Sequence, residues 1–233
     1  MKLYIVATPI GNLEDMTFRA IRILKEVDLI LCEDTRVTKI LLEKYEIKKP
    51  ILNYHQHSKL QKIDYIINLL KGGKNLALVS DAGTPGISDP GQRLIGKVLE
   101  ELGEEVKIEP IPGANAAISA LSISGFNTDE FLFLGFPPHK KGRQTFFVNV
   151  LEESQKRTVV FYESTHRIIK ALEQIKELLE ARSYNLEPNL VVCRELTKKF
   201  ETIYRGTIME VLEKLKNDII KGEFVVVIKA KKA

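Results

Sequence analysis

The chain has 233 residues, of which 44% are hydrophobic and 28% charged, with 35 Lys and Arg against 31 Asp and Glu. This composition excludes disordered, collagen-like and coiled-coil proteins, and the length suits one or two domains. No apolar run approaches the roughly 18 residues that a membrane span needs. The first apolar run is broken by Pro9 and Gly11 too early for a signal peptide, so we expect no membrane contact and a cytoplasmic location.

Short β-branched runs alternate with stretches of helical period along the whole chain. The runs predict strands at residues 3–7, 28–32, 75–79, 105–109, 131–135, 157–162, 189–193 and 224–230. Between them the apolar spacing predicts helices at residues 17–26, 36–45, 59–71, 91–102, 114–123, 143–152, 166–181 and 207–220. Continuous apolar strands that alternate with helices are typical of an α/β fold with mainly parallel sheets.

A cluster of prolines and glycine near the middle of the chain predicts a hinge between two domains. Pro110, Pro112 and Gly113 stand there, so we expect an N-terminal α/β domain at 1–112 and a second domain at 113–233. Residues 195–206 alternate less cleanly and predict a hairpin. The second sheet is therefore expected to be mixed rather than purely parallel.

The net charge of +4 lies entirely in the second half of the chain. Residues 1–112 carry 16 basic and 16 acidic side chains, whereas residues 113–233 carry 19 and 15. A small excess of this kind indicates either a contact with an anionic partner or an ordinary solvated surface. Cys32 and Cys193 each follow an apolar run, which predicts buried thiols rather than a disulfide or a metal site.

Two loops that follow predicted strands have the composition of a ligand site. In open α/β sheets, ligands bind beyond the carboxyl ends of the strands. Residues 7–13 contain Gly11, which lets a ligand approach the backbone closely. Residues 80–91 hold three glycines and two prolines, which predicts a fixed loop with few side chains over its polar backbone groups.

The small residues at 112–117 open a predicted helix, whose free N–H groups suit a carboxylate or a phosphate. Neither the dinucleotide fingerprint G-x-G-x-x-G nor the phosphate loop G-x-x-x-x-G-K-[ST] occurs; Gly72-Gly73-Lys74 lacks the Ser or Thr that should follow. Dinucleotide and nucleoside triphosphate sites therefore have no support.

Several motifs along the chain form a recognisable set. They are Thr8-Pro9-Ile10-Gly11-Asn12-Leu13-Glu14-Asp15, Cys32-Glu33-Asp34-Thr35-Arg36, residues 80–91, Pro112-Gly113-Ala114-Asn115, residues 133–137, residues 161–167, residues 194–198 and residues 222–225. Together they resemble one family, that of the cytidine 2′-O-methyltransferases of small-subunit ribosomal RNA, within the tetrapyrrole methylase superfamily. The motifs follow the order of that family from residue 3 to residue 230.

The resemblance implies a homodimer of two-domain α/β chains with a cofactor cleft between the domains. S-adenosylmethionine would be the cofactor, and the substrate would be the ribose 2′-hydroxyl of a cytidine in the decoding region of 16S RNA. By match to the superfamily motifs, the cofactor would be lined by Pro9, Ile10, Gly11, Ser80, Asp81, Gly83, Thr84, Pro85, Ile87, Ser88, Pro112, Gly113, Ala114, Asn115, Ala116, Tyr162, Leu196 and Thr197. Backbone polar groups and apolar walls suit this ligand better than a phosphate cradle does.

The residues after the second predicted strand are candidates for catalysis. Glu33 or Asp34 would act as the base that takes the hydroxyl proton, and Arg36 would clamp a phosphate. The alternative is that Asp34 caps the following helix and Arg36 forms a surface ion pair. Asp81 is expected to hold the cofactor or its own loop rather than to act as the base. His55 and His57 have no cysteine or carboxylate cluster beside them, so no metal site is expected.

Basic residues follow an aromatic turn in the second half of the chain. Lys140, Lys141 and Arg143 come after the turn at 135–138, and Lys198 lies in another loop of the same basic half. Basic groups beside aromatic rings suit contacts with single-stranded RNA, although such a run is also typical of a solvated loop.

Two other functions remain open from the sequence. One is a sibling methylase of the superfamily, acting on a tetrapyrrole or on a protein side chain; the other is a non-catalytic RNA-binding protein with a methylase fold. Many members of the resembled family carry a further helical region after the last strand, whereas this sequence ends at Lys231-Lys232-Ala233. We therefore expect shape to contribute much of the RNA recognition.

Overall fold

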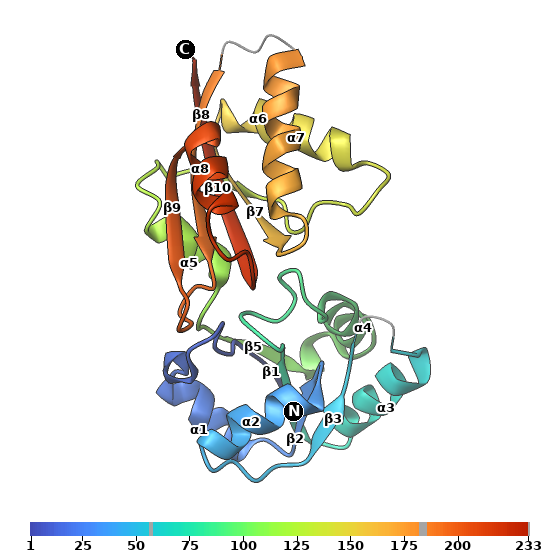
Figure 1. Ribbon diagram of the computed structural model, residues 1–233. Helices are drawn as coiled ribbons and strands as arrows, with labels where there is room; N and C mark the ends of the chain where they lie inside the picture. The colour runs from blue at the N-terminus through green and yellow to red at the C-terminus, as the bar shows by residue number, and fades with distance from the viewer. Residues whose placement is uncertain (56–57, 182–185, 233) are drawn as a thin grey trace. The chain divides into compact units, whose positions relative to one another are not determined.

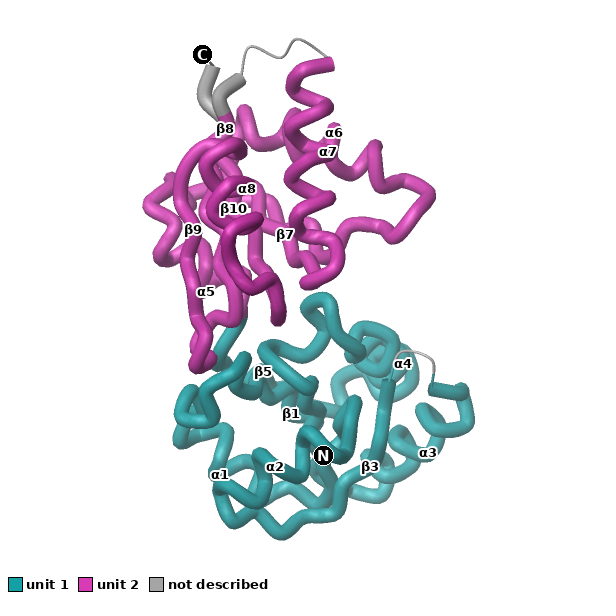
Figure 2. Tube along the Cα trace, in the orientation of Figure 1, with its two compact units in different colours: residues 1–115 teal, residues 116–233 magenta. Residues whose placement is uncertain are grey.

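The computed structural model describes residues 1–55, 58–181 and 186–232, which form two compact units, 1–115 and 116–233 (Figure 2). Each unit holds one five-stranded sheet with helices packed on it. This confirms the predicted α/β class with two sheets. No helix among the described residues combines the length and apolar character that a membrane crossing requires.

The sheet of the first unit is entirely parallel, in the order β3-β2-β4-β1-β5. Its strands are β1 (Lys2–Val6), β2 (Leu29–Cys32), β3 (Ile51–Asn53), β4 (Asn75–Val79) and β5 (Lys107–Ile111). Its helices are α1 (Phe18–Glu26), α2 (Thr35–Lys44), α3 (Leu60–Lys71) and α4 (Gln92–Leu102), with short 3-10 turns at Leu13–Asp15 and Gly103–Glu105.

The helices of this unit cover both faces of its sheet (Figure 1). Apolar residues of α1 and α2, such as Leu24 and Leu41, share one core with one face of the sheet. Residues of α3 and α4, such as Ile66 and Val98, form a second core with the other face. Burial on both faces explains why the strands are continuous apolar runs in the sequence.

The sheet of the second unit is mixed, in the order β6-β7-β10-β8-β9. Its strands are β6 (Phe131–Phe133), β7 (Thr158–Ser164), β8 (Leu186–Arg194), β9 (Thr202–Thr207) and β10 (Glu223–Lys232). The pair β6 and β7 is parallel, and the other pairs are antiparallel. Its helices are α5 (Ala116–Ser122), α6 (Arg143–Ser154), α7 (Ile168–Ala181) and α8 (Ile208–Lys216).

One large core joins α6, α7 and α8 to the sheet of the second unit, with Phe147, Leu172 and Val211 fully buried in it. The predicted mixed sheet is confirmed. The hairpin differs in detail from the prediction, because its first strand is β8 and residues 195–201 form the connection to β9. Strand β3 was not predicted, since three residues after Pro50 are too few to show a period. Both cysteines are buried free thiols, as expected.

Candidate active site

The carboxyl edge of the sheet in the first unit has the topology of a ligand site. Strands β1 and β4 are neighbours, but α1 and α4, which follow them, pack on opposite faces of the sheet. Loops that leave adjacent strands toward opposite faces mark the switch point at which open α/β sheets bind ligands. The predicted loops at 7–13 and 80–91 both begin at this point.

The loops after β1 and β4 are joined by a short antiparallel bridge. The N–H of Thr8 donates to the carbonyl of Gly83 at 2.9 Å, and the N–H of Gly83 donates to the carbonyl of Thr8 at 3.0 Å. The buried hydroxyl of Thr8 also donates to the carbonyl of Ser80 at 3.0 Å. These bonds hold the two loops as one piece.

The loop after β5 is joined to the loops after β1 and β4. The N–H of Ala7 donates to the carbonyl of Ile111 at 3.2 Å, and the hydroxyl of Thr84 donates to the carbonyl of Ala114 at 3.3 Å. A Cβ atom on Gly113 would lie only 3.0 Å from the Cβ of Ala7, so a larger residue there would push the two loops apart by a few tenths of an ångström. The predicted cofactor residues of the first unit, Pro9 to Gly11, Ser80 to Ser88 and Pro112 to Asn115, therefore share one assembled edge.

The loop at 80–91 has unusual backbone conformations. Gly83 and Gly86 have φ of +80° and +84°, and Ser88 has φ of +61°. A non-glycine residue in this region costs of order 1 kcal/mol or more, and such residues cluster where a loop is shaped for function. A Cβ on Gly83 would lie 3.5 Å from the Cγ2 of Ile10. The loop is therefore fixed, as its composition predicts.

Asp34 caps a helix and forms an ion pair, which is the alternative to its acting as a base. Its carboxylate caps α2 by accepting the N–H of Arg36 at 2.8 Å, and it forms an ion pair with the Arg36 guanidinium at 2.6 Å. These contacts hold the pKa of Asp34 well below its usual value, at about 2. A carboxylate with so low a pKa is a weak base, and Arg36, whose side chain is 88% exposed, already has a partner.

Glu33 and Asp81 differ from Asp34 in their electrostatics. Partial burial raises the pKa of Glu33, and the negative charge of Asp81 raises it further, against the opposing effect of His55. Burial also raises the pKa of Asp81, although the N–H of Asp34 donates to its carboxylate at 2.9 Å. A carboxyl group with a raised pKa takes up a proton more readily, which suits a general base.

Tyr162 on β7 is positioned by the second unit. Its hydroxyl accepts the N–H of Ala117 at 3.2 Å, and its ring lies edge-on to those of Phe133 and Phe136, with centroids 5.0 Å and 5.3 Å away. The contact brings Tyr162 next to the first turn of α5, which Ala116 begins.

Leu196 and Thr197 lie in the turn after β8. Leu196 is buried, and Thr197 has φ of +65°. Glu195, with φ of +51°, anchors this turn, since its carboxylate accepts the N–H of Glu223 at 2.9 Å.

The predicted RNA contacts separate into two groups. Lys140 and Lys141 are exposed and form no ion pair with a described residue. The prediction for Arg143 is wrong as a surface contact. Its side chain is 8% exposed and pairs with the fully buried carboxylate of Glu163 at 3.1 Å. Lys198 is already neutralised, by Glu195 at 2.9 Å and by Glu223 at 2.8 Å.

Arg143 and Arg167 both support the loop that precedes α6. Arg143 donates to the carbonyl of Pro138 at 3.3 Å, and Arg167 donates to that of Pro137 at 3.4 Å. Glu163 pairs with both guanidinium groups. The buried carboxylate thus fixes the loop that carries Lys140 and Lys141, a role that sequence spacing does not reveal.

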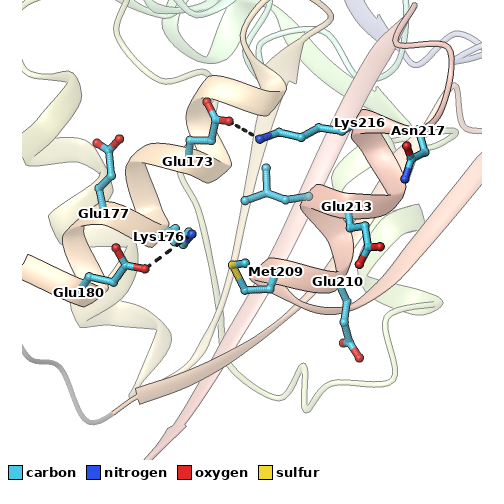
Figure 3. Close-up of a pocket in the computed structure, with 10 residues that line it drawn as sticks. Glu173, Lys176, Glu177, Glu180, Met209, Glu210, Glu213, Lys216 and Asn217 are labelled. Carbon is cyan, nitrogen blue, oxygen red and sulfur yellow. Dashed lines mark ion pairs between the residues drawn. The ribbon is translucent and has the colours of Figure 1, made fainter.

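A hollow between α7 and α8 lies away from the predicted site residues (Figure 3). Its volume is about 800 Å³, and five glutamates line it. Its two lysines pair with two of them, Lys216 with Glu173 at 2.6 Å and Lys176 with Glu180 at 3.7 Å. Its remaining net negative charge disfavours RNA. None of its described lining residues is a predicted site residue.

A second hollow of about 530 Å³ lies in the first unit, beside β3 and α3, and His55 is among its lining residues. His57 lies outside the described residues. Among the residues that are described, no three His, Cys, Asp or Glu side chains are grouped to hold a metal ion.

The sequence and the fold both have known counterparts. The family model for tetrapyrrole (corrin/porphyrin) methylases matches residues 2–212. A Bacillus subtilis protein named ribosomal RNA small subunit methyltransferase I is 48% identical over 226 residues, 97% of this chain and 74% of that protein. A Thermotoga maritima protein of the same name is 43% identical over 230 residues, 99% of each chain. A crystal structure of diphthine synthase shares the fold, with a TM-score of 0.70 at 16% identity, covering 98% of this chain and 90% of that one.

Proposed function

The chain belongs to the tetrapyrrole methylase family, and on this premise we propose that it methylates the RNA of the small ribosomal subunit. The acceptor would be the 2′-hydroxyl of a cytidine in the decoding region of 16S RNA, and S-adenosylmethionine would be the methyl donor. The observation that carries the proposal is identity of 43–48% with relatives named ribosomal RNA small subunit methyltransferase I, over at least 97% of the chain.

The joined loops of the first unit fit S-adenosylmethionine. They present small residues and backbone polar groups, with the half-exposed side chain of Ile87 as apolar surface, whereas Ile10 is buried. Gly86 has open space where a Cβ would stand, so its backbone is accessible. When bound, S-adenosylmethionine supplies a methyl group on a positively charged sulfur, which is already activated for transfer. Tyr162, Leu196, Thr197 and Ala116 are proposed as the contribution of the second unit.

Within this proposal, Glu33 is the base for the acceptor hydroxyl. Its raised pKa favours proton uptake, whereas Asp34 is held ionised by Arg36 and by the end of α2. Asp81 shares the raised pKa, but its carboxylate also accepts the N–H of Asp34, which suits a role in holding the loop or the cofactor. The remaining work of the site is alignment of the hydroxyl with the donor.

The exposed pair Lys140 and Lys141 is proposed to contact RNA phosphates. Phe136, which is 53% exposed, lies in the same loop and offers a ring for stacking. Replacement of both lysines by alanine is expected to weaken RNA binding and to lower its salt dependence, with cofactor affinity unchanged. An unchanged salt dependence would remove these lysines from the RNA contact.

The family resemblance also supports a homodimer. A cytoplasmic location and a domain boundary at 112/113, within the Pro and Gly residues at 110–113, remain predictions from the sequence. Light scattering at several protein concentrations tests the dimer. A mass equal to one chain at micromolar concentration would contradict it.

The direct test is transfer of labelled methyl from S-adenosylmethionine to isolated small ribosomal subunits, to naked 16S RNA and to a tetrapyrrole precursor. We expect label in the RNA and at a ribose oxygen, which nuclease-resistant dinucleotide analysis identifies. Label only in the tetrapyrrole would favour a sibling methylase instead. Failure of S-adenosylmethionine to raise the melting temperature would favour a non-catalytic RNA-binding protein.

A further inference from the structure

The hollow beside β3 and α3 lies at the same sheet edge as Glu33. Strand β3 pairs with β2, so that Asn53 stands opposite Cys32, and the N–H of Tyr54 extends the pairing to the Cys32 carbonyl at 2.7 Å. The side-chain amide of Asn53 donates to the carbonyl of Glu33. His55, which lines the hollow, and Glu33 therefore both follow the carboxyl ends of adjacent parallel strands.

The lining of this hollow is basic and aromatic. Lys59, Lys62 and His55 line it together with the ring of Tyr65, which is 53% exposed. Neither lysine forms an ion pair with a described residue, and none of the described lining residues is acidic. Uncompensated ammonium groups beside an accessible aromatic ring suit the phosphate and the base of one nucleotide.

One wall of the hollow is held by a hydrogen bond within its own loop and by one from a separate helix. The N–H of His55 donates to the hydroxyl of Ser58 at 3.0 Å, and the guanidinium of Arg93, at the start of α4, donates to the carbonyl of Ser58 at 3.2 Å. Ser58 is only 4% exposed. Binding of a flexible strand loses less entropy when the receiving surface is already ordered in this way.

We infer that the hollow lined by His55, Lys59, Lys62 and Tyr65 is a binding site for single-stranded RNA. It would hold a nucleotide that flanks the methylated one, with its phosphate on the two lysines and its base on Tyr65. The inference rests on the proposed function, because an RNA substrate supplies the flanking nucleotide. It adds a contact surface in the half of the chain that has no net charge.

The test measures binding of a single-stranded oligonucleotide with the decoding-region sequence, by fluorescence anisotropy at several salt concentrations. Lys59→Ala with Lys62→Ala is expected to weaken binding about tenfold and to lower the salt slope by about 1.4, the value for two phosphate contacts on a single strand. Tyr65→Ala is expected to weaken binding about tenfold, and Tyr65→Phe to retain the wild-type affinity, because the ring still stacks.

The matched control is Lys176→Ala with Lys216→Ala in the acidic hollow of the second unit, where each lysine is paired with a glutamate. It removes the same number of charges and is expected to change RNA affinity less than twofold. Equal losses in both double variants, or an unchanged salt slope for Lys59 and Lys62, would overturn the inference. The inference would also be overturned if the Lys59 and Lys62 variant kept its RNA affinity but lost binding of poly-glutamate. That result would identify an acidic protein segment as the ligand.

Two further measurements separate this inference from the proposed function. Affinity for S-adenosylmethionine, measured by calorimetry, is expected to be unchanged in all the variants. If the wild-type protein methylates small subunits while the Lys59 and Lys62 variant binds RNA normally, the inference fails and the proposed function stands. If the wild-type protein methylates no RNA but these variants still lose RNA binding, the proposed function fails and the RNA site stands.

Discussion

The carboxylates at the sheet edge of the first unit and those in the α7/α8 hollow of the second are alike in chemistry but not in environment. Glu33 and Asp81 are partly withdrawn from water and follow strand ends that backbone hydrogen bonds fix. Glu173 and Glu180 stand on a helix surface and pair with lysines. The α7/α8 hollow therefore holds ordinary surface charges, whereas the sheet edge holds carboxyl groups with raised pKa values. Volume alone does not identify an active site, whereas burial and backbone positioning of charge do.

The strongest test of this contrast is replacement of Glu33, the proposed base. Glu33→Gln is expected to lower kcat by roughly 10²- to 10⁴-fold, or about 3–5 kcal/mol in activation free energy, since Asp34 is held ionised by Arg36 and the carboxylate of Asp81 is engaged by the N–H of Asp34. In the wild-type enzyme the rate should fall with decreasing pH as Glu33 becomes protonated, at a pH above that for an ordinary carboxyl group. That acidic limb should disappear in the variant. Glu177→Gln in the acidic hollow is the control and should leave kcat unchanged.

A second test compares a buried ion pair with an exposed one. Glu163→Gln leaves two guanidinium groups, of which that of Arg143 is almost fully buried, without their carboxylate. We expect the free energy of unfolding to fall by about 3–5 kcal/mol. Glu180→Gln, which breaks the exposed pair with Lys176, should change it by less than about 1 kcal/mol. Urea denaturation measures both, and equal effects would contradict the role given to Glu163.

A third test concerns the glycine that joins the loops of the first unit. Gly83→Val places a branched side chain at φ +80° against Ile10. The free energy of unfolding should fall by about 1–3 kcal/mol. The affinity for S-adenosylmethionine should fall at least tenfold. Gly73→Val is the matched control, because Gly73 has φ of +82° but open space around it, before β4. It should lose comparable stability and keep its cofactor affinity, as calorimetry would report.

The smallest expected effect concerns Asp34. Its pKa is lowered from 3.8 to about 2, so the contribution of its charge to stability is present above about pH 4 and is lost as the pH falls toward 2. Asp34→Asn keeps a cap for α2 but removes the pairing with Arg36. Its urea midpoint should therefore lie slightly below that of the wild type at pH 7 and meet it near pH 2. A constant difference at all pH values would show that the charge is not responsible.

The sequence predicts the fold well because most of its strands and helices have clear apolar periods. It also predicts which loops share an edge, since parallel strands end on the same side. It does not predict the partners of individual side chains. Arg143 follows two lysines and resembles them in the sequence, but it begins α6 and turns toward Glu163, twenty residues away. Whether Asp34 acts as a base or as a helix cap paired with Arg36 depends on where the Arg36 side chain lies, which the sequence does not show.

Strand order also has a consequence for synthesis on the ribosome. In the first unit, β1 is made first but pairs with β4 and β5, so its sheet cannot close until residue 111 has emerged. In the second unit, β10 lies between β7 and β8, so that sheet lacks its central strand until residues 223–232 have emerged. Each nascent half therefore exposes unpaired apolar strands for most of its translation, and folding should be completed late and in two separate steps.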